Sequence, residues 1–342
     1  MTTSTTDDVV LRRLGPAEGA ILTSAIRTAY GPSYDIRWVY DADEVRARLT
    51  DGRYVSVVAE TPGGDLLCHM GLALATPGDV VGHAGQAVTL AAARGRHLFT
   101  RTKRFLMDWA RDRGMAGMYS EVTAAHPYSQ KANLAVGAWE TGFLLGWIPA
   151  TVANDAATDT VRRRRSAAFF YAKVNDGHDR PVYAPPRHRE VIGRTLDRSA
   201  LRGRLAEPPP GAEPAVRTVL HTEIDRDHNL AVLTATEPGA DLAEVVGAVR
   251  HRLFHHDRLD AVYLDLPLVS PGTALVAEDL EALGVSYAGI FPNHRADGDV
   301  LRMQSLHGIR ITADDVVVAS DHGRELLDYV LADLPHTSRQ PG

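Results

Sequence analysis

The chain has 342 residues, of which 44% are hydrophobic and 23% are charged, and its formal net charge is −6. This composition is typical of a globular protein with about two ordinary domains, and it excludes an intrinsically disordered chain. The negative net charge gives the molecule as a whole no electrostatic attraction to nucleic acid. The sequence has no apolar run long enough to span a bilayer and no apolar leader, so we expect a cytoplasmic protein that does not bind membranes.

The first half of the chain alternates predicted strands and helices. Apolar residues at the spacing of a strand or of a helix, separated by glycine and proline, define them. The predicted strands are residues 9–14, 54–60, 66–75, 85–90, 118–122, 143–148 and 167–174. The predicted helices are residues 16–29, 43–49, 98–113 and 128–136. This order predicts a mixed α/β domain over residues 7–175, with the single cysteine, Cys68, as a buried core residue.

The second half begins after a segment rich in proline and arginine. Residues 176–215 predict a linker with one helix embedded near 187–201. A second α/β segment over 216–335 follows, with predicted strands at 216–222, 230–235, 261–266, 287–291 and 300–306 and predicted helices at 242–254, 273–283 and 323–334. Residues 119–149 and 264–292 share the order strand, proline-containing turn, helix, glycine, strand, with one gap. This likeness predicts that the second segment repeats the rear part of the first.

The most informative stretch joins the strand at 85–90 to the long helix at 98–113. Between them lies a short basic turn, Arg94-Gly95-Arg96, followed by the helix N-terminus with its outward-facing N–H groups. Such a turn is a ready site for an anion such as a pyrophosphate. Further basic side chains add positive charge nearby, namely Arg101, Lys103 and Arg104.

This strand, turn and helix resemble the acyl-CoA loop of the GNAT superfamily of acyltransferases, usually written Arg/Gln-x-x-Gly-x-Gly/Ala. The resemblance implies that the backbone of Val88, Thr89 and Leu90 pairs with the pantetheine arm of the donor. It also implies that a run of turn amides holds the pyrophosphate, those of Arg94, Gly95, Arg96, His97, Leu98 and Phe99. The sequence departs from the family pattern at His97 and Phe99, where glycine or alanine is usual. His97 narrows the space for a pyrophosphate, and a donor with one phosphate, such as phosphopantetheine on a carrier protein, is less affected.

A second motif follows at the distance expected in the same family. Residues 126–137, His-Pro-Tyr-Ser-Gln-Lys-Ala-Asn-Leu-Ala-Val-Gly, resemble the GNAT segment in which the helix after the fifth strand begins with Asn or Ser and ends at a glycine. Together the two motifs imply a GNAT-like α/β fold with a mixed sheet over residues 7–175. The repeat then implies a tandem arrangement in which residues 216–335 form a degenerate GNAT-like domain.

Transfer of an acyl group from a thioester to an amine needs a base for the amine and an acid for the leaving thiolate. In this family a Glu on the fourth or fifth strand is often the base, and a Tyr on the next helix is often the acid. The predicted fourth strand carries no carboxylate, so Glu121 on the fifth strand and His126 are the candidate bases. Tyr128 and Ser129 are the candidate acids. The alternatives are a solvated sheet residue for Glu121, a backbone-bonding residue for His126 and a helix N-cap for Ser129.

The aromatic residues Tyr30, Tyr34 and Trp38, with Gln86 on the fourth strand, lie where GNAT domains bind the acceptor; the alternative for the aromatic residues is simple packing. The resemblance implies an N-acyltransferase that moves an acyl group from an acyl-CoA or a carrier-protein thioester to an amine of a small molecule, without a metal. An acyl carrier protein is then a candidate partner. Two alternatives stay open: a non-catalytic sensor or scaffold that binds a thioester, and a hydrolase or decarboxylase with the same fold. The sequence leaves the oligomeric state open.

Overall fold

The computed structural model describes residues 9–152 and 163–335, and the chain divides into two compact units. The first unit runs to Ser120 and includes Val152, and the second runs from Glu121 onward. The chain therefore passes from the first unit to the second inside a strand, β5 (Gly117–Thr123). Both units mix helices with parallel and antiparallel strands, which confirms the predicted α/β class. Residues 7, 8 and 153–162 of the predicted first domain lie outside the described residues.

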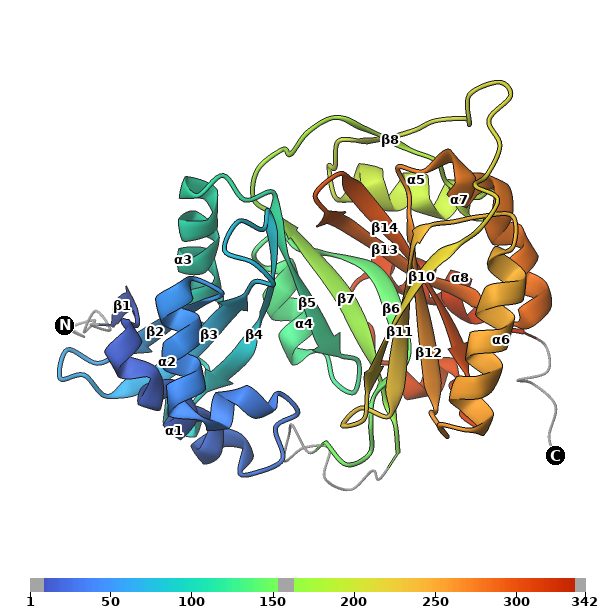
Figure 1. Cartoon of the computed structure of the whole chain (residues 1–342). Coiled ribbons are helices and arrows are strands. Elements are labelled where there is room, and N and C mark those ends of the chain that lie inside the picture. Colours follow the sequence, from blue (N-terminus) through green and yellow to red (C-terminus); the bar gives the residue numbers. More distant parts are fainter. Residues whose placement is uncertain (1–8, 153–162, 336–342) are drawn as a thin grey trace. The chain divides into compact units, whose positions relative to one another are not determined.

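The first unit holds a sheet with the strand order β1-β2-β3-β4-β5 (Figure 1). Its other strands are β1 (Val10–Arg13), β2 (Tyr54–Glu60), β3 (Leu66–Ala73) and β4 (Val81–Thr89). Its helices are α1 (Gly19–Tyr30), α2 (Ala42–Asp51) and α3 (Leu98–Asp112), with short 3₁₀ helices η1 (Pro16–Glu18), η2 (Arg37–Tyr40) and η3 (Ala91–Ala93). Neighbouring strands are antiparallel except β4 and β5, which are parallel. A parallel pair needs a crossover connection, and α3 supplies it.

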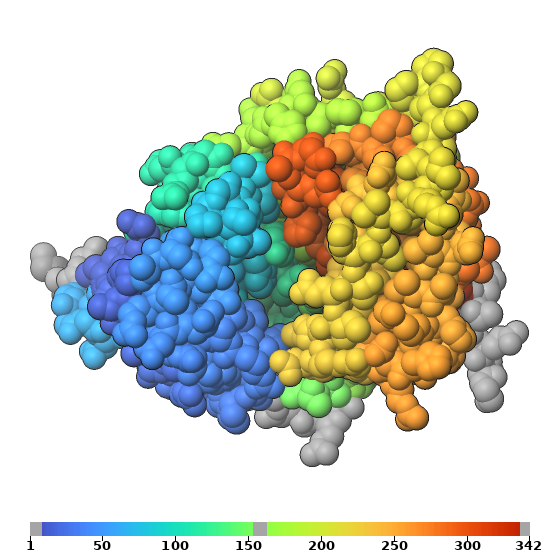
Figure 2. Space-filling model, in the orientation of Figure 1, coloured from blue at the N-terminus to red at the C-terminus, as the bar shows by residue number. Residues whose placement is uncertain are grey.

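Helices cover both faces of this sheet. Residues of α1 and α2 pack in one buried cluster with Val88 of β4, whereas Leu98 at the start of α3 packs with Cys68 of β3 in another. Cys68 pairs with Thr89 and His69 pairs with Val88. Because successive strand residues point to opposite faces, the two clusters lie on opposite sides of the sheet. On the face shown in Figure 2, residues of α1 and α2 form the surface of the unit.

Strand β4 is irregular in its middle. Gln86 has a left-handed φ of 49°, and the register between β3 and β4 shifts between His69 and Gly71. These are the marks of a β-bulge, which bends a strand and changes the direction of its edge. The parallel pairing with β5 ends before the bulge, at His83 and Tyr119. The bulge therefore separates a paired first part of β4 from a second part, residues 87–89, that continues beyond this ladder.

The second unit holds a sheet with the order β7-β6-β13-β14-β12-β11-β10. Its strands are β6 (Trp139–Ile148), β7 (Arg165–Lys173), β10 (Val219–Asp225), β11 (Leu230–Glu237), β12 (Ala261–Pro267), β13 (Ser286–Arg295) and β14 (Gly298–Leu306). Its helices are α4 (Tyr128–Leu134), α5 (Arg189–Arg198), α6 (Leu242–His255), α7 (Pro271–Val276) and α8 (Asp321–Ala332), with 3₁₀ helices η4 (Pro186–His188), η5 (Ala277–Leu283) and η6 (Ala313–Asp315). Strands β11 and β12 are parallel, with α6 between them, and the other neighbours are antiparallel.

The segment predicted as a linker is packed rather than extended. Its helix α5 buries Val191, Ile192 and Leu196, and β8 (Arg180–Val182) pairs with β9 (Gly203–Leu205) in a small parallel sheet. Arg180 is fully buried and forms an ion pair with Asp299 of β14 at 2.5 Å. A buried charge pair of this kind fixes the segment on the second unit, because breaking it would leave an uncompensated charge in the core.

The two halves of the chain share one succession of elements. In the first, β4 leads through α3 to the parallel strand β5, and in the second β11 leads through α6 to the parallel strand β12. Leu98 and Leu242 are the first residues of the two helices, and Gly117 and Ala261 are the first residues of the two following strands. Each pair of strands is followed by a short helix and then by a hairpin, β6–β7 or β13–β14. The two halves therefore have the same order of elements over these stretches, and the internal repeat stays a prediction.

Strands β6 and β13 meet at a pair of glycines in the second unit. Gly142 and Gly289, the fourth residue of each strand, are direct partners, and a Cβ on Gly289 would lie 2.3 Å from the Gly142 Cα. Gly289 also has a φ of 156°. We therefore expect Gly289→Ala to lower the free energy of unfolding by at least ~2 kcal/mol in chemical denaturation. Gly78→Ala is the control, since its Cβ would meet nothing within 4 Å; equal stability of the two variants would contradict the close approach.

Candidate functional site

The second part of β4 presents one residue's backbone away from β3. The Leu90 amide donates to the Leu67 carbonyl at 3.0 Å, and Val88 faces His69 in the same register. In an antiparallel pair the residues alternate between bonded and non-bonded positions, so the Thr89 amide and carbonyl point to the opposite edge. Of the three residues predicted to hold the pantetheine arm, Thr89 is thus the one whose backbone faces outward. The prediction for Val88 and Leu90 is corrected, because their backbone groups face β3.

The basic turn has the backbone conformation that its glycine predicts. Gly95 has a φ of 79°, and His97, which precedes the first residue of α3, has a φ of 56°. His97 thus adopts a left-handed conformation, which costs a non-glycine residue about 1 kcal/mol. Its side chain is exposed and that of Phe99 is half-buried, whereas Leu98 is buried. His97 is therefore exposed at the surface of the turn.

Lys103 differs from the other basic residues predicted near the turn. Arg94 and Arg104 are exposed, but Lys103 is only 2% exposed and its Nζ donates a hydrogen bond to Ser120 Oγ at 3.2 Å. Burial lowers the pKa of Lys103 to about 7, because the charged form loses its hydration. Lys103 therefore lies in the interior, unlike the exposed arginines. Its burial was not evident from the sequence, since a lysine on an amphipathic helix normally faces solvent.

The residues predicted to line the acceptor pocket gather around the bulge of β4. Tyr30 stacks on Tyr34 at 5.0 Å between ring centroids and donates its hydroxyl to the Ala87 carbonyl at 2.7 Å. Trp38 packs at the edge of the Tyr54 ring at 4.9 Å. Tyr34 is buried in the α1–α2 cluster. Gln86 is 1% exposed, and neither of its side-chain polar atoms has a hydrogen-bond partner among residues 9–152 and 163–335. These residues lie together, and Tyr30 holds the backbone of the bulge.

His69, which was not predicted from the sequence, contacts the backbone of the bulge from the neighbouring strand β3. Its Nδ1 lies 2.8 Å from the Gln86 carbonyl oxygen and its Nε2 lies 2.6 Å from Ser56 Oγ. Burial lowers the pKa of His69 to about 4, so the ring is neutral at pH 7. A neutral ring that donates to Gln86 accepts from Ser56, which satisfies all three groups. The signal in the sequence was a histidine inside the apolar run of the strand predicted at 66–75.

The candidate acids and bases belong to the second unit. Glu121 on β5 is half-buried, and its charge adds to the effect of burial, which is the main cause of the raised pKa of Tyr263. The His126 and Tyr128 rings lie 5.2 Å apart, and Tyr128 is 72% exposed. Ser129 is the second residue of α4, whose N-cap is Pro127. The alternative in which Ser129 caps the helix is therefore wrong.

A carboxylate paired with an arginine lies in β12 at the place that Glu121 has in β5. Counted from the first residues of β5 and β12, Glu121 corresponds to Asp265. Asp265 receives two hydrogen bonds from Arg302, both 2.6 Å long, and both side chains are buried. The Arg302 guanidinium also lies over the Phe291 ring at 4.0 Å. Arg302 therefore occupies both carboxylate oxygens of Asp265, in a bidentate pair within the interior of the second unit.

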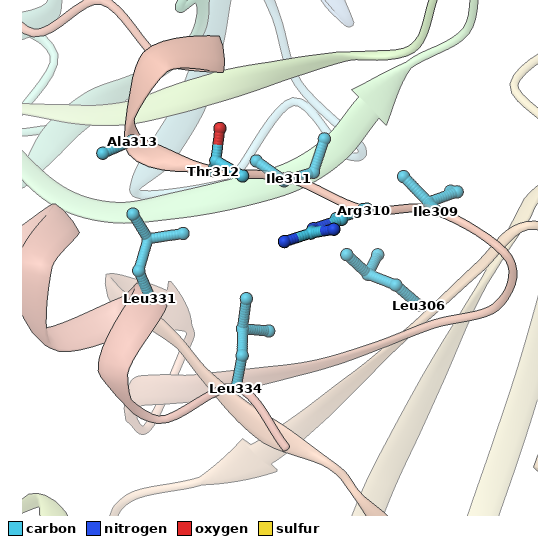
Figure 3. Close-up of a pocket in the computed structure, with 8 residues that line it drawn as sticks. All are labelled: Leu306, Ile309, Arg310, Ile311, Thr312, Ala313, Leu331 and Leu334. Carbon is cyan, nitrogen blue, oxygen red and sulfur yellow. The ribbon is translucent and has the colours of Figure 1, made fainter. Parts of the chain in front are cut away.

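Two pockets lie within single units, apart from the predicted site residues. One, of about 340 Å³, lies in the second unit between α8 and residues 306–313, and the Arg310 side chain extends into it among leucine and isoleucine side chains (Figure 3). The other, of about 390 Å³, lies in the first unit and is lined by Arg13, Trp109 and Arg113 among others. In the described part of the chain, no three His, Cys, Asp or Glu residues are placed to hold a metal ion. No helix within residues 9–152 and 163–335 is long and apolar enough to cross a membrane.

No family model matches the sequence, and no curated protein is significantly similar to it. Among solved structures, the spermidine/spermine N-acetyltransferase SpeG from Vibrio cholerae is 13% identical, with a TM-score of 0.39 over 49% of this chain and 93% of that chain. The ribosomal-protein-S5-alanine acetyltransferase from Vibrio fischeri is 10% identical, with a TM-score of 0.40 over 50% and 96%. The GNAT superfamily phosphinothricin acetyltransferase Pat from Sinorhizobium meliloti is 18% identical, with a TM-score of 0.39 over 48% and 88%. This likeness concerns the fold alone, over about half of the chain.

Proposed function

We propose that the chain is a GNAT-type N-acyltransferase that moves an acyl group from a phosphopantetheine thioester to an amine of a small molecule. The observation that carries the proposal is the second part of β4, which continues beyond its ladder with β5 and leads into a left-handed basic turn at the start of α3. An outward strand edge can pair with the amides of a pantetheine arm, and a helix N-terminus can hold its phosphate. Thr89 supplies the edge, and the amides from Gly95 to Phe99 surround the phosphate.

The donor class follows from the turn. The His97 side chain is exposed beside the amides that a pyrophosphate would approach, and Arg94 is exposed on the other side of Gly95. A single phosphate, as on a phosphopantetheinylated carrier protein, needs less space than the pyrophosphate of CoA. The proposal includes both CoA and a carrier protein as donors. The phosphopantetheine of a carrier protein fits better, because His97 replaces a glycine that is usual in the acyl-CoA loop.

The chemistry is direct attack of the amine on the thioester carbonyl. Glu121 or His126 takes the proton of the amine, and the amides near Thr89 polarise the carbonyl. Tyr128 or Ser129 gives a proton to the leaving thiolate. The carbonyl carbon forms a bond to nitrogen and loses its bond to sulfur, so the products are an amide and a free thiol.

The second half completes the proposal as a degenerate copy. We place the acyltransferase domain at residues 7–175 and the degenerate domain at 216–335, joined by 176–215. Support comes from the shared succession of strands and helices and from the ion pair that occupies Asp265. The loop between β11 and α6, residues 238–241, reads Pro-Gly-Ala-Asp and lacks the arginines of the first turn.

Donor titration by calorimetry tests the proposal. The wild-type chain is expected to bind CoA and, more tightly, a phosphopantetheinylated carrier protein, and to form an amide product in a mixture of amines followed by mass. Arg94→Ala is expected to weaken donor binding by about 5-fold to 10-fold at low salt and by less at high salt, because salt screens an exposed charge. Arg111→Met, at the far end of α3, is the matched control. Tight binding with no amide product would favour a sensor, and no binding of either thiol would contradict the proposal.

A further inference from the structure

A buried lysine lies beneath the point where β4 and β5 separate. Lys103 projects from the sheet-facing side of α3, and its Nζ donates to Ser120 Oγ at 3.2 Å. The Ser120 hydroxyl, also buried, donates to the Ala84 carbonyl at 2.9 Å. All three residues belong to the first unit. Two successive hydrogen bonds therefore connect the helix to the backbone of β4.

The two hydrogen bonds lie at the position where the next pair of residues of β4 and β5 would be joined by backbone hydrogen bonds. Strands β4 and β5 pair at three positions, the last of which is His83 with Tyr119. Ala84 and Ser120 come next along the two strands, and there the serine side chain, rather than a ladder partner, occupies the carbonyl. The left-handed residue Gln86 follows two positions later. The side-chain hydrogen bonds therefore coincide with the end of strand pairing.

The second repeat provides an internal comparison. Its parallel strands β11 and β12 pair at five positions, and the fourth and fifth are Leu233 with Leu264 and Thr234 with Asp265. Leu264 corresponds to Ser120, and Gly247 in α6 corresponds to Lys103 when both are counted from the first residues of their elements. The strands β11 and β12, which lack a counterpart of the lysine and the serine, are thus paired over more positions than β4 and β5. The fold itself does not need a buried amine at this place.

We propose that Lys103 and Ser120 are positioning residues of the donor site, which end the β4–β5 ladder after His83 and so keep the outer edge of β4 open for the pantetheine arm. The identity of the ligand rests on the proposed function, whereas the ending of the ladder does not. A lysine suits this role because its long stem crosses the apolar layer under the sheet and its amine still offers N–H donors when neutral. Burying an amine is unfavourable, and such a residue is retained where function needs it.

Hydrogen exchange and donor kinetics together test the proposal on the full chain. Ser120→Leu copies the second repeat, and Lys103→Met removes the donor at similar side-chain length. Lys103→Gln keeps a neutral donor, and Arg111→Met is the control on the same helix. We expect amide exchange over residues 84–90 to slow by about 10-fold or more in the leucine and methionine variants, because additional ladder bonds protect these amides.

In the same two variants the KM for the donor should rise by about 10-fold, the effect of losing roughly one hydrogen bond, while kcat at saturating donor stays within about 3-fold. Lys103→Gln should restore most of both properties. Unchanged exchange over residues 84–90 in folded Ser120→Leu would overturn the proposal, even if the wild-type chain transfers acyl groups. Slowed exchange in a chain that binds no thioester would instead support the ending of the ladder and overturn the proposed function.

Discussion

Replacement of Glu121 with Gln is expected to lower kcat/KM for acyl transfer by about 10²-fold or more. The amide cannot accept the proton that the attacking amine must lose, while its size and place on β5 stay the same. His126→Ala, measured beside it, separates the two candidate bases, since only the variant that lacks the base should show the full loss. Initial rates of amide formation over a range of amine concentrations give the result.

The matched control for Glu121→Gln is Glu223→Gln, because Glu223 is an exposed glutamate on β10 of the second unit. Its rate should equal that of the wild-type chain. Tyr128→Phe adds a test of the acid and should also slow transfer by about 10²-fold if the phenol protonates the thiolate. Full activity in all of the Glu121, His126 and Tyr128 variants would contradict the catalytic assignment while leaving donor binding untouched.

Lys103→Met is expected to stabilise the chain while it impairs the donor site. Burial lowers the pKa of Lys103 from 10.5 to about 7. The unfolded chain therefore binds one proton more than the folded chain between about pH 7 and pH 10, and the stability of the wild type rises with pH over that range. Below pH 7 both states hold the proton and the penalty stays constant. At about 1.4 kcal/mol per pKa unit, the methionine variant should be more stable by an amount on the order of 4 kcal/mol at pH 7.

Urea denaturation of both proteins from pH 6 to pH 10 checks this expectation. The difference in the free energy of unfolding should be largest at and below pH 7 and should shrink steadily toward pH 10. The other titrating groups contribute equally to both proteins and cancel in the difference. A constant difference across the range would mean that Lys103 titrates as an ordinary exposed lysine, which its 2% exposure argues against.

Periodicity and turn residues predicted most of the elements correctly because their causes are local. The helix at 98–113 was evident from its apolar face, and α3 spans Leu98–Asp112. The strand predicted at 143–148 begins earlier, at Trp139, because Glu140 and Thr141 are polar residues buried by tertiary packing. The strand predicted at 216–222 is displaced to Val219–Asp225. Tertiary contacts, which a local pattern does not contain, decided these boundaries.

The basic turn of the candidate site could be predicted from the sequence, whereas the buried residues His69 and Lys103, which are connected to β4 by hydrogen bonds, could not. Gly95 and the helix start are local features, and a turn followed by a helix was expected there. The bulge at Gln86 depends on the register against β3, and the hydrogen bonds of His69 and Lys103 join residues that are 17 apart in the chain. Nothing in a single strand or helix indicates such partners. For the same reason the outward direction of Thr89, rather than of Val88 or Leu90, became evident only from the pairing of β4 with β3.

A crystal structure of the chain with CoA, or with a phosphopantetheinylated carrier protein, tests the central claim most directly. We predict phosphate density within hydrogen-bond distance of the main-chain amides between Gly95 and Phe99, with an amide of the arm bonded to the backbone of Thr89. Density for the thiol at any other place, or a turn that stays empty at saturating ligand, would contradict the account.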